Sequence, residues 1–326
     1  MLKGCATAPA KTILLGEHFV VYGEPAIVTA IDRKAKVTAQ ESPGTSIHIT
    51  SDLGCGTFEG ADFKTSDSCR KVRRILEPIR ISTQSVLDYL KLKRGLDVNV
   101  ESVIPVGVGL GSSSAISVAT VAAVGRLFDG RLSTSDIFSL ALDAEKFVHG
   151  NPSGIDQQVS AFGGILLYRK GGTSTRLQCP VELPLVIGNT GESRTTGRLV
   201  ESVRQRHERL PNIMNQLIKV AGGLVEEGAA ALKKGDLQRF AELMDINHGL
   251  LVSAGVSTEA LDRLAHAAKA AGALGAKLTG AGGGGCIVAM SEPGEQSKVA
   301  EGIKRAGGEP IIVEKADTGV QSWLEK

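Results

Sequence analysis

The chain has 326 residues, of which 42% are hydrophobic and 22% charged, and its formal net charge at pH 7 is +2. This composition is typical of a globular protein with one large domain or two ordinary ones, and the small net charge gives no reason to expect a nucleic acid as partner. Because the apolar runs are shorter than the roughly 18 residues of a membrane span and no cysteines form a C-x-x-C pair, the sequence predicts a cytoplasmic protein without a membrane span, disulfide framework or zinc site.

Short apolar runs interrupted by glycine and proline predict strands between residues 10 and 40. The polar residues 42–68 predict loops with short strands. From about Cys69 to Arg94 we expect a helical region that breaks at Pro78, because proline removes a helical hydrogen bond. The alternating "LDVNVESVIP" then predicts a strand, and "SAISVATVAAVGRLF", which is apolar on nearly all sides, predicts a buried helix.

The best-defined helix pattern begins after Ser133, which together with Asp136 resembles a capping box. Its apolar positions recur at helical spacing, at Ile137, Leu140, Ala141, Ala144 and Val148. Glu145 falls at the edge of this apolar face. Two interpretations of Glu145 stay open, an ordinary residue at the edge of a buried face or a carboxylate that faces a cleft.

A change of composition near residues 170–180 predicts a domain boundary, with one domain over residues 1–175 and a second over 176–326. Further helix patterns cover about 195–234, 237–252 and 258–272, strand patterns cover "GGILLYRK", "AKLTG" and "CIVAM", and "EGIKRAGGEPIIVEK" predicts a helix and then a strand. Because strands and helices follow one another in mixed order, we expect an α+β fold and not a regular parallel α/β array.

The chain has 40 glycines, and two tracts are especially rich in them. The first, "GVGLGSSSA" from Gly107 to Ala115, joins a predicted strand to the predicted buried helix. Glycines let the backbone approach a ligand closely, the start of a helix offers unbonded N–H groups and a positive dipole end, and serine hydroxyls can bind Mg²⁺. The tract therefore predicts a triphosphate site, although a tight turn that needs glycine for packing is the alternative.

The second tract, "GAGGGG" from Gly280 to Gly285, matches the G-x-G-x-x-G pattern of dinucleotide-binding proteins. A strand-like segment follows it where that fold requires a helix, so we do not interpret it as a dinucleotide site. Taken alone, it is equally consistent with a packing loop and a ligand loop. A third segment, "HGNPSGIDQQVSAFGG", carries a single acidic residue, Asp156, which is either a turn residue or a proton acceptor.

Four motifs occur in the order and spacing of one family: "APAKTILLGEHFVVYGEPAI", "PVGVGLGSSSA", "HGNPSGIDQQVSAFGG" and "KLTGAGGGGC". Together they resemble the GHMP kinases, over nearly the whole chain and least at about residues 42–80. The segments "GEHFVVYG", "HGNPSGID" and "GESRTTGRLV" are most similar to the branch that phosphorylates mevalonate. The resemblance implies a two-domain fold, with an N-terminal domain like the second domain of ribosomal protein S5 and a ferredoxin-like C-terminal domain. ATP and mevalonate would meet between them, and the 5-hydroxyl of mevalonate would receive the γ-phosphoryl group in isoprenoid biosynthesis.

The resemblance also implies roles for individual residues. Asp156 corresponds to the catalytic base and Lys11 to the lysine that contacts it, while Ser113 and Glu145 correspond to the Mg²⁺ ligands. Ser114 stands where many relatives have alanine, so which of the three serines binds the metal stays open. The residues that correspond to ATP-binding positions are Pro105, Gly107, Gly109, Leu110, Gly111, Ser112, Ser113, Ser114 and Ala115 in the first loop and Gly282 and Gly283 in the second. Glu17, His18 and Thr196 correspond to substrate-side positions.

General chemistry agrees with this assignment, because phosphoryl transfer needs neutralised phosphate charge and an oriented nucleophile. A serine and one carboxylate suit Mg²⁺, which binds few protein oxygens besides phosphates and water. The resemblance further favours a homodimer, while the small net charge and the short apolar runs predict no nucleic-acid or membrane partner. The alternatives are a related kinase for phosphomevalonate, homoserine or the 3-hydroxyl of mevalonate, and a catalytically silent nucleotide-binding sensor. The presence of Lys11, Glu145 and Asp156 argues against the silent protein.

Overall fold

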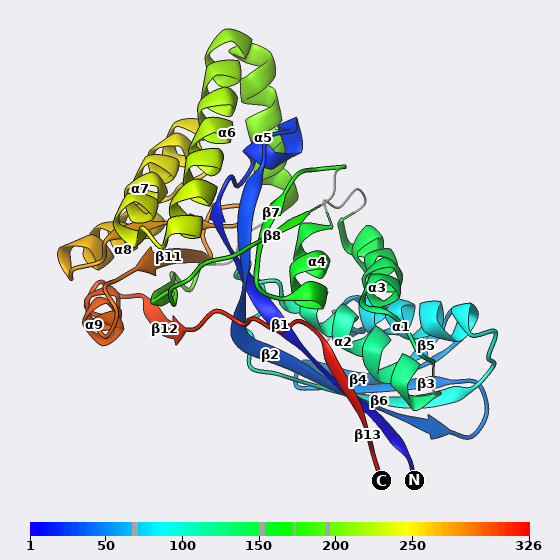
Figure 1. The fold of residues 1–326 in the computed structure, drawn as a ribbon. Helices are drawn as coiled ribbons and strands as arrows, with labels where there is room; N and C mark the ends of the chain where they lie inside the picture. The colour runs from blue at the N-terminus through cyan, green and yellow to red at the C-terminus, as the bar shows by residue number, and fades with distance from the viewer. Residues whose placement is uncertain (67–70, 129, 150–153, 172–173, 193–195) are drawn as a thin grey trace.

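A computed structural model describes residues 1–66, 71–128, 130–149, 154–171, 174–192 and 196–326 (Figure 1). Within these ranges the chain forms two β-sheets with helices packed on each, and the long strands β1 (Lys3–Leu15) and β2 (Ala26–Ser42) run through the middle of the molecule. The largely antiparallel sheets and the separately grouped helices confirm the predicted α+β class.

The first sheet holds most of the described strands. Besides β1 and β2 it contains β3 (Ile47–Ser51), β4 (Gly54–Glu59), β5 (Asp62–Lys64), β6 (Gly95–Ser102), β7 (Ile165–Tyr168), β8 (Thr175–Leu177) and β13 (Gln321–Glu325). Their order is β13-β1-β2-β6-β3-β4-β5, with β7 beside β2 and β8 beside β7. Among these described strands, β3 and β6 run parallel and the other pairs are antiparallel.

The last strand of the chain, β13, pairs with the first, so that Lys3 lies opposite Glu325 and Thr7 opposite Gln321. Figure 1 shows the two termini side by side at the end of this strand pair. The sequence analysis did not predict β13. Because β13 pairs with β1, the first sheet contains strands from both sides of the domain boundary expected between residues 175 and 176.

Helices cover the first sheet and pack on one another beside it. They are α1 (Val72–Tyr89), α2 (Ser112–Leu127), α3 (Thr134–His149) and α4 (Ile155–Phe162). The helices α1, α2 and α4 contact the sheet, and α3 packs on these helices. Most side chains of α2 are buried, as its apolar sequence predicts. The Ser133 N–H donates to Asp136 Oδ2 over 2.8 Å and the Asp136 N–H donates to Ser133 Oγ over 3.2 Å, which confirms the capping box of α3.

The expected break at Pro78 is wrong, because α1 continues through this residue. A proline inside a helix costs about 3 kcal/mol. That cost is smaller than what the buried face of α1 contributes, since burying one large aliphatic side chain stabilises the fold by roughly 1.5–3 kcal/mol. The buried apolar residues on this face are Val72, Leu76, Ile79, Val86 and Leu87.

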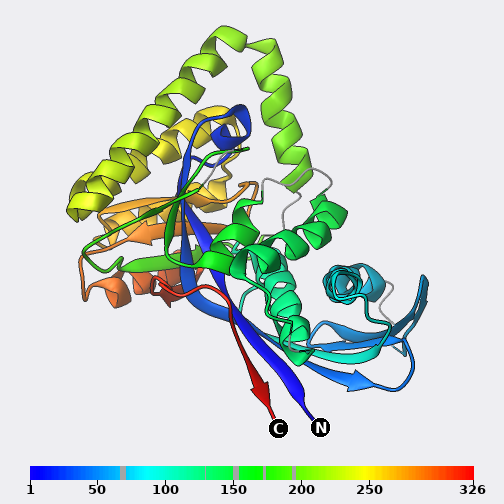
Figure 2. The same cartoon turned by 45° about the vertical axis from the view of Figure 1, so that its right-hand side comes forward.

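The second sheet has the order β10-β11-β9-β12 and is antiparallel throughout its described strands. These strands are β9 (Leu185–Asn189), β10 (Gly275–Thr279), β11 (Cys286–Met290) and β12 (Glu309–Val313). Helices α7 (Leu237–Ala254), α8 (Glu259–Ala270) and α9 (Gln296–Arg305) pack on this sheet. The predicted helical zone before them is two helices, α5 (Thr196–Arg209) and α6 (Pro211–Lys234), which meet at Leu210 in the hairpin at the top of Figure 2.

The two sheets meet where β1 contacts β10 and where α6 and α7 lie against β1. Directly after β1, the short helix η1 (Phe19–Tyr22) contacts α6. The chain segment between β1 and η1 therefore lies at the junction of the two halves. In the described part of the chain, we find no helix with the length and apolar character needed to cross a bilayer.

Candidate active site

Lys11 on β1 and Asp156 on α4 form an ion pair, with 2.9 Å between Lys11 Nζ and Asp156 Oδ1. The Lys11 side chain is 4% exposed and the Asp156 side chain is 25% exposed. An enclosed ammonium group needs a carboxylate partner, and here that partner is also open to solvent. The two residues that the resemblance implies to be catalytic are therefore in contact, and Asp156 is accessible to a substrate.

The start of α4 fixes the direction of Asp156. Gly154 precedes the helix with a φ of 79°, in the left-handed region that favours glycine, and Asp156 lies in the first helical turn. The positive end of the helix dipole stabilises a carboxylate at this place. The turn thus positions the carboxylate. Residues 150–153 of the same motif lie outside the described part of the chain.

Glu145 on α3 is 9% exposed, and burial together with the negative charge of Asp156 raises the pKa of its carboxyl to about 8. The Lys11 ammonium and a hydrogen bond with Gln157 act in the opposite direction on this pKa. Glu145 is therefore close enough to the Lys11–Asp156 pair to interact with both charges. Of the two interpretations left open by the sequence, the structure favours a carboxylate that faces the site.

The oxygen atoms at this place fit a magnesium ion. Glu145 Oε2 is buried and has no hydrogen-bond partner in the described structure, which leaves an acceptor available for a cation. At the start of α2, Ser113 is exposed while Ser112 and Ser114 are buried, so Ser113 is the serine of the three that a ligand can reach. The described residues contain no group of three or more His, Cys, Asp or Glu that could hold a metal. One carboxylate and one hydroxyl would suit Mg²⁺ bound to a nucleotide, because this ion keeps phosphate and water ligands besides a few protein oxygens.

The first glycine tract forms a loop that leads into the N-terminus of α2. Gly107, Gly109 and Gly111 all have positive φ, and Gly111, with a φ of 76°, is the N-cap residue of the helix. Gly111 has no side chain to cap α2, and the described structure shows no side-chain cap bond there, so the first N–H groups of α2 are suited to bind an anion. The Lys11 N–H donates to Leu110 O over 2.9 Å, which joins this loop to the strand that carries Lys11.

Gly111 also leaves room for the Lys11 side chain. A Cβ at Gly111 would lie 2.9 Å from Lys11 Cγ, which is closer than non-bonded carbons approach. The missing side chain of Gly111 therefore allows the lysine to pass beneath the loop toward Asp156.

We expect Gly111→Ala to lower kcat by about tenfold, because a displaced Lys11 no longer meets Asp156 and the transferred group in the right geometry. Gly44→Ala is the matched control. Gly44 has a φ of 84°, and among the described residues no atom beyond its chain neighbours lies within 4 Å of an added Cβ, so its substitution introduces the same backbone strain without touching Lys11. Steady-state kinetics and thermal unfolding of both variants check this. Equal kcat values for the two variants would show that the contact with Lys11 is unimportant.

The second glycine tract packs tightly against helix α5 and against the loop after α7. A Cβ at Gly282 would lie 2.1 Å from Val256 O, and a Cβ at Gly283 would lie 2.6 Å from Leu199 Cδ1. The Gly283 N–H donates to Val256 O over 2.8 Å. This loop therefore needs glycine for packing. A ligand-binding role for Gly282 and Gly283 stays a prediction.

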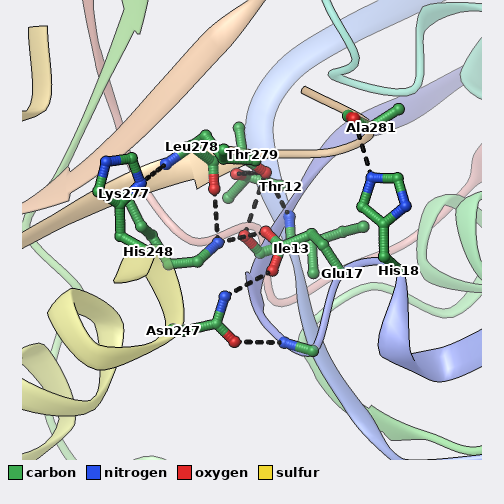
Figure 3. A network of polar contacts seen from close by, with 11 residues as sticks. Thr12, Ile13, Glu17, His18, Asn247, His248, Lys277, Leu278, Thr279 and Ala281 are labelled. Atoms are coloured by element: carbon green, nitrogen blue, oxygen red, sulfur yellow. Dashed lines mark hydrogen bonds and ion pairs between the residues drawn. The ribbon is translucent and has the colours of Figure 1, made fainter. Parts of the chain in front are cut away.

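The substrate-side residues of the sequence analysis lie in two places. Glu17 and His18 follow β1, and His18 Nε2 donates to Ala281 O of the second glycine loop over 2.8 Å (Figure 3). Glu17 is 1% exposed, and its carboxylate forms an ion pair with Lys277. Thr196 begins α5, but its side chain lies outside the described structure.

The sequence analysis missed two residues of this region, Lys277 and Asn247. Both are fully buried, and both contact the Gly16–Glu17 segment. Lys277 stands in the quoted motif "KLTGAGGGGC", so a signal was present. Asn247 lies inside an ordinary helix pattern, and nothing in its local sequence separates it from a surface residue.

Comparison with known proteins gives matches over both halves of the chain. The family models described as "GHMP kinases N terminal domain" and "GHMP kinases C terminal" match residues 75–164 and 229–309. A mevalonate kinase from Thermococcus sibiricus is 42% identical, over 98% of this chain and 98% of its own. Among solved structures, an L. major mevalonate kinase in complex with R-mevalonate has a TM-score of 0.83 at 28% identity, and it covers 95% of this chain and 94% of its own. The Methanococcus jannaschii mevalonate kinase has a TM-score of 0.81 at 25% identity, over 96% of this chain and 98% of its own.

Proposed function

Because the chain belongs to the mevalonate kinases of the GHMP kinase family, we propose that it transfers the γ-phosphoryl group of ATP to the 5-hydroxyl of mevalonate. The product is 5-phosphomevalonate, an intermediate of isoprenoid synthesis. ATP is the co-substrate. The observation that carries the assignment of the reacting residues is the Lys11–Asp156 ion pair, which lies beside the first glycine loop and within electrostatic reach of Glu145.

Asp156 orients the 5-hydroxyl of mevalonate and accepts its proton, since its carboxylate is the accessible member of the pair. Lys11 holds this carboxylate in place and offers a positive charge to the oxygens of the transferred group. Because the transition state of phosphoryl transfer is loose, the proton can leave late. The charge of Lys11 is then as important as the base.

The N-terminus of α2 and the loop from Pro105 to Ala115 bind the ATP phosphates, as their unbonded N–H groups and positive φ angles support. Ser113 and Glu145 would hold Mg²⁺, which neutralises phosphate charge when it is bound. We place Glu17, His18 and Thr196 on the substrate side, and Gly282 and Gly283 near the phosphates. The cysteine pattern favours the cytoplasm, and the family resemblance favours a homodimer.

A panel of small alcohols tests the proposal. The purified protein is incubated with ATP, Mg²⁺ and, in turn, mevalonate, phosphomevalonate and homoserine, and ADP release is measured. We expect turnover with mevalonate and a product whose ³¹P signal is split by the two protons on C5. Turnover with homoserine or phosphomevalonate but not mevalonate would overturn the substrate, and an unsplit ³¹P signal would assign the phosphate to the tertiary 3-hydroxyl. ATP binding without turnover of any alcohol would identify a silent sensor.

A further inference from the structure

A buried polar network joins the segment after β1 to the second half of the chain (Figure 3). Its members are Gly16 and Glu17 on one side and Asn247 of α7 and Lys277 of β10 on the other. None of these four residues was given a role in binding ATP, and both charged groups are 1% exposed or less. Buried charges are costly unless they are paired, so the geometry of this network is closely defined.

Lys277 fixes one oxygen of Glu17. Its ammonium group contacts Glu17 Oε1 and also donates to Leu278 O over 2.6 Å. Burial raises the pKa of Glu17 and lowers that of Lys277, and the attraction between the two groups opposes both changes. A lysine without this carboxylate, or the carboxylate without this lysine, would be a buried charge without an opposite charge beside it. The pair therefore ties the segment after β1 to β10.

Asn247 fixes the other oxygen of the same carboxylate. Its Nδ2 donates to Glu17 Oε2 over 3.3 Å, and its Oδ1 accepts the Gly16 N–H over 3.1 Å. The carboxylate is thus held from two different elements, α7 and β10. Two contacts on separate oxygens restrict the rotation of Glu17 as well as its position.

His18, the next residue, has a backbone conformation that needs such support. Its φ is 61°, a left-handed value that non-glycine residues rarely adopt because it strains the backbone. Its ring donates to Ala281 O over 2.8 Å, two residues after the end of β10. The strand that carries Lys277 therefore holds the histidine from two sides, through Glu17 and through the glycine loop.

We propose that Lys277 and Asn247 are positioning residues for phosphoryl transfer, which act through Glu17 to hold His18 against the glycine loop. Both side chains are fully buried, so they are placed to act through Glu17. The inference rests on the proposed function, because His18 is assigned there to the substrate side. It also gives Glu17 a specific task, since this carboxylate faces the network and holds the loop on which His18 lies.

The variants Lys277→Met, Asn247→Ala and Glu17→Gln test the inference. We expect Lys277→Met and Asn247→Ala to raise the KM for mevalonate about tenfold or more and to lower kcat, because small displacements of a substrate-binding group have large effects. The KM for ATP should change much less. Glu17→Gln keeps an oxygen that can accept from Lys277, so its KM for mevalonate should lie between those of the wild type and Lys277→Met.

Lys269→Met is the matched control. Lys269 Nζ donates to Asp245 Oδ2 over 2.6 Å and to Leu274 O over 2.7 Å. Like Lys277, it therefore contacts one carboxylate and one backbone carbonyl, and this carbonyl belongs to the residue before β10. Its side chain is 40% exposed, and its contacts do not involve the Gly16–His18 segment. We expect wild-type kinetics from this variant.

A purely structural role for the network predicts a different result. The thermal midpoint would fall, the KM for mevalonate would keep its wild-type value, and kcat would fall only with the folded fraction. That pattern in Asn247→Ala and Glu17→Gln would overturn the inference, even if Lys277→Met did not fold, because both of these variants retain the lysine. A wild-type protein that does not phosphorylate mevalonate would instead refute the proposed function.

Discussion

Asp156→Asn is expected to lower kcat by at least about a hundredfold while ATP still binds, a loss within the range for removal of a general base. Asparagine keeps the shape of the side chain but cannot accept the proton of the hydroxyl group. It also removes the negative charge that lies 2.9 Å from the enclosed Lys11 ammonium, so the geometry of the lysine is expected to change as well. Steady-state kinetics with mevalonate and titration with an unreactive ATP analogue measure the two effects separately.

Asp143→Asn is the control for this prediction. Asp143 also lies 2.9 Å from a lysine, Lys146, but both side chains are about half exposed on the outer face of α3. Exposed pairs of this kind contribute about 0–1 kcal/mol to stability, so the variant should retain wild-type turnover. Near-normal turnover in Asp156→Asn would remove this residue from the role of base, and loss of ATP binding would indicate a folding defect.

A double variant separates the base from the charge of the lysine. If Asp156 and Lys11 act as one unit, Lys11→Met combined with Asp156→Asn should be little worse than the more damaging single variant. If the lysine stabilises the transferred group independently, the two effects on kcat should multiply. The result would measure how much of the rate depends on the positive charge.

Local patterns were enough to predict much of the fold. The alternation of "LDVNVESVIP", the apolar surface of α2 and the capping box at Ser133 each depend on neighbours along the chain, and each gave the element that the structure shows. The continuous α1 and the strand β13 depend on distant contacts. Pro78 is tolerated because the rest of its helix is buried, and β13 forms because β1 presents a free edge more than 300 residues away.

In the candidate site, too, local sequence predicted some features, whereas features that depend on distant contacts were missed. Lys11 and Asp156 were identified through motifs, and Glu145 through a helix pattern and the family resemblance. The structure brings all three together. Local sequence could not show that Gly111 accommodates the Lys11 side chain or that Asn247 bonds the Glu17 carboxylate, because these contacts join elements that are distant along the chain. The contacts of Lys277 were hidden for the same reason, even though the residue stands inside a quoted motif.

Glu145→Gln is expected to raise the Mg²⁺ concentration needed for half-maximal activity by about ten- to a hundredfold. The loss of a ligand should cost at least as much metal affinity as the loss of a residue that only supports a ligand. The amide keeps one oxygen but carries no charge, and Mg²⁺ binds anionic oxygen strongly. An unchanged Mg²⁺ titration would argue against metal ligation at this position.

The raised pKa of Glu145 gives the same variant a second, metal-independent signature. The pKa of the carboxyl is about 8 in the folded protein against an ordinary value of 4.5, so the folded state binds a proton that the unfolded state has released over this range. The stability contributed by the protonated group is fully present below pH 4.5 and is lost as the pH rises toward 8. Glutamine resembles the protonated carboxyl and does not titrate, so without Mg²⁺ the Glu145→Gln protein should lose less thermal stability between pH 5 and pH 8 than the wild type.

Proton release connects the two effects of this substitution. A metal ion needs the ionised carboxylate, so Mg²⁺ binding to the wild type with an ATP analogue should release a proton from Glu145 at pH 7 and tighten as the pH rises toward 8. Calorimetry in two buffers of different ionisation enthalpy measures this proton, and it should be missing in Glu145→Gln. The Asp143→Asn protein, with its carboxylate removed from the outer face of the same helix, should release it as the wild type does. Equal proton release from Glu145→Gln and the wild type would mean that the released proton does not come from Glu145. Glu145 would then not bind the metal, even if the Mg²⁺ requirement had changed.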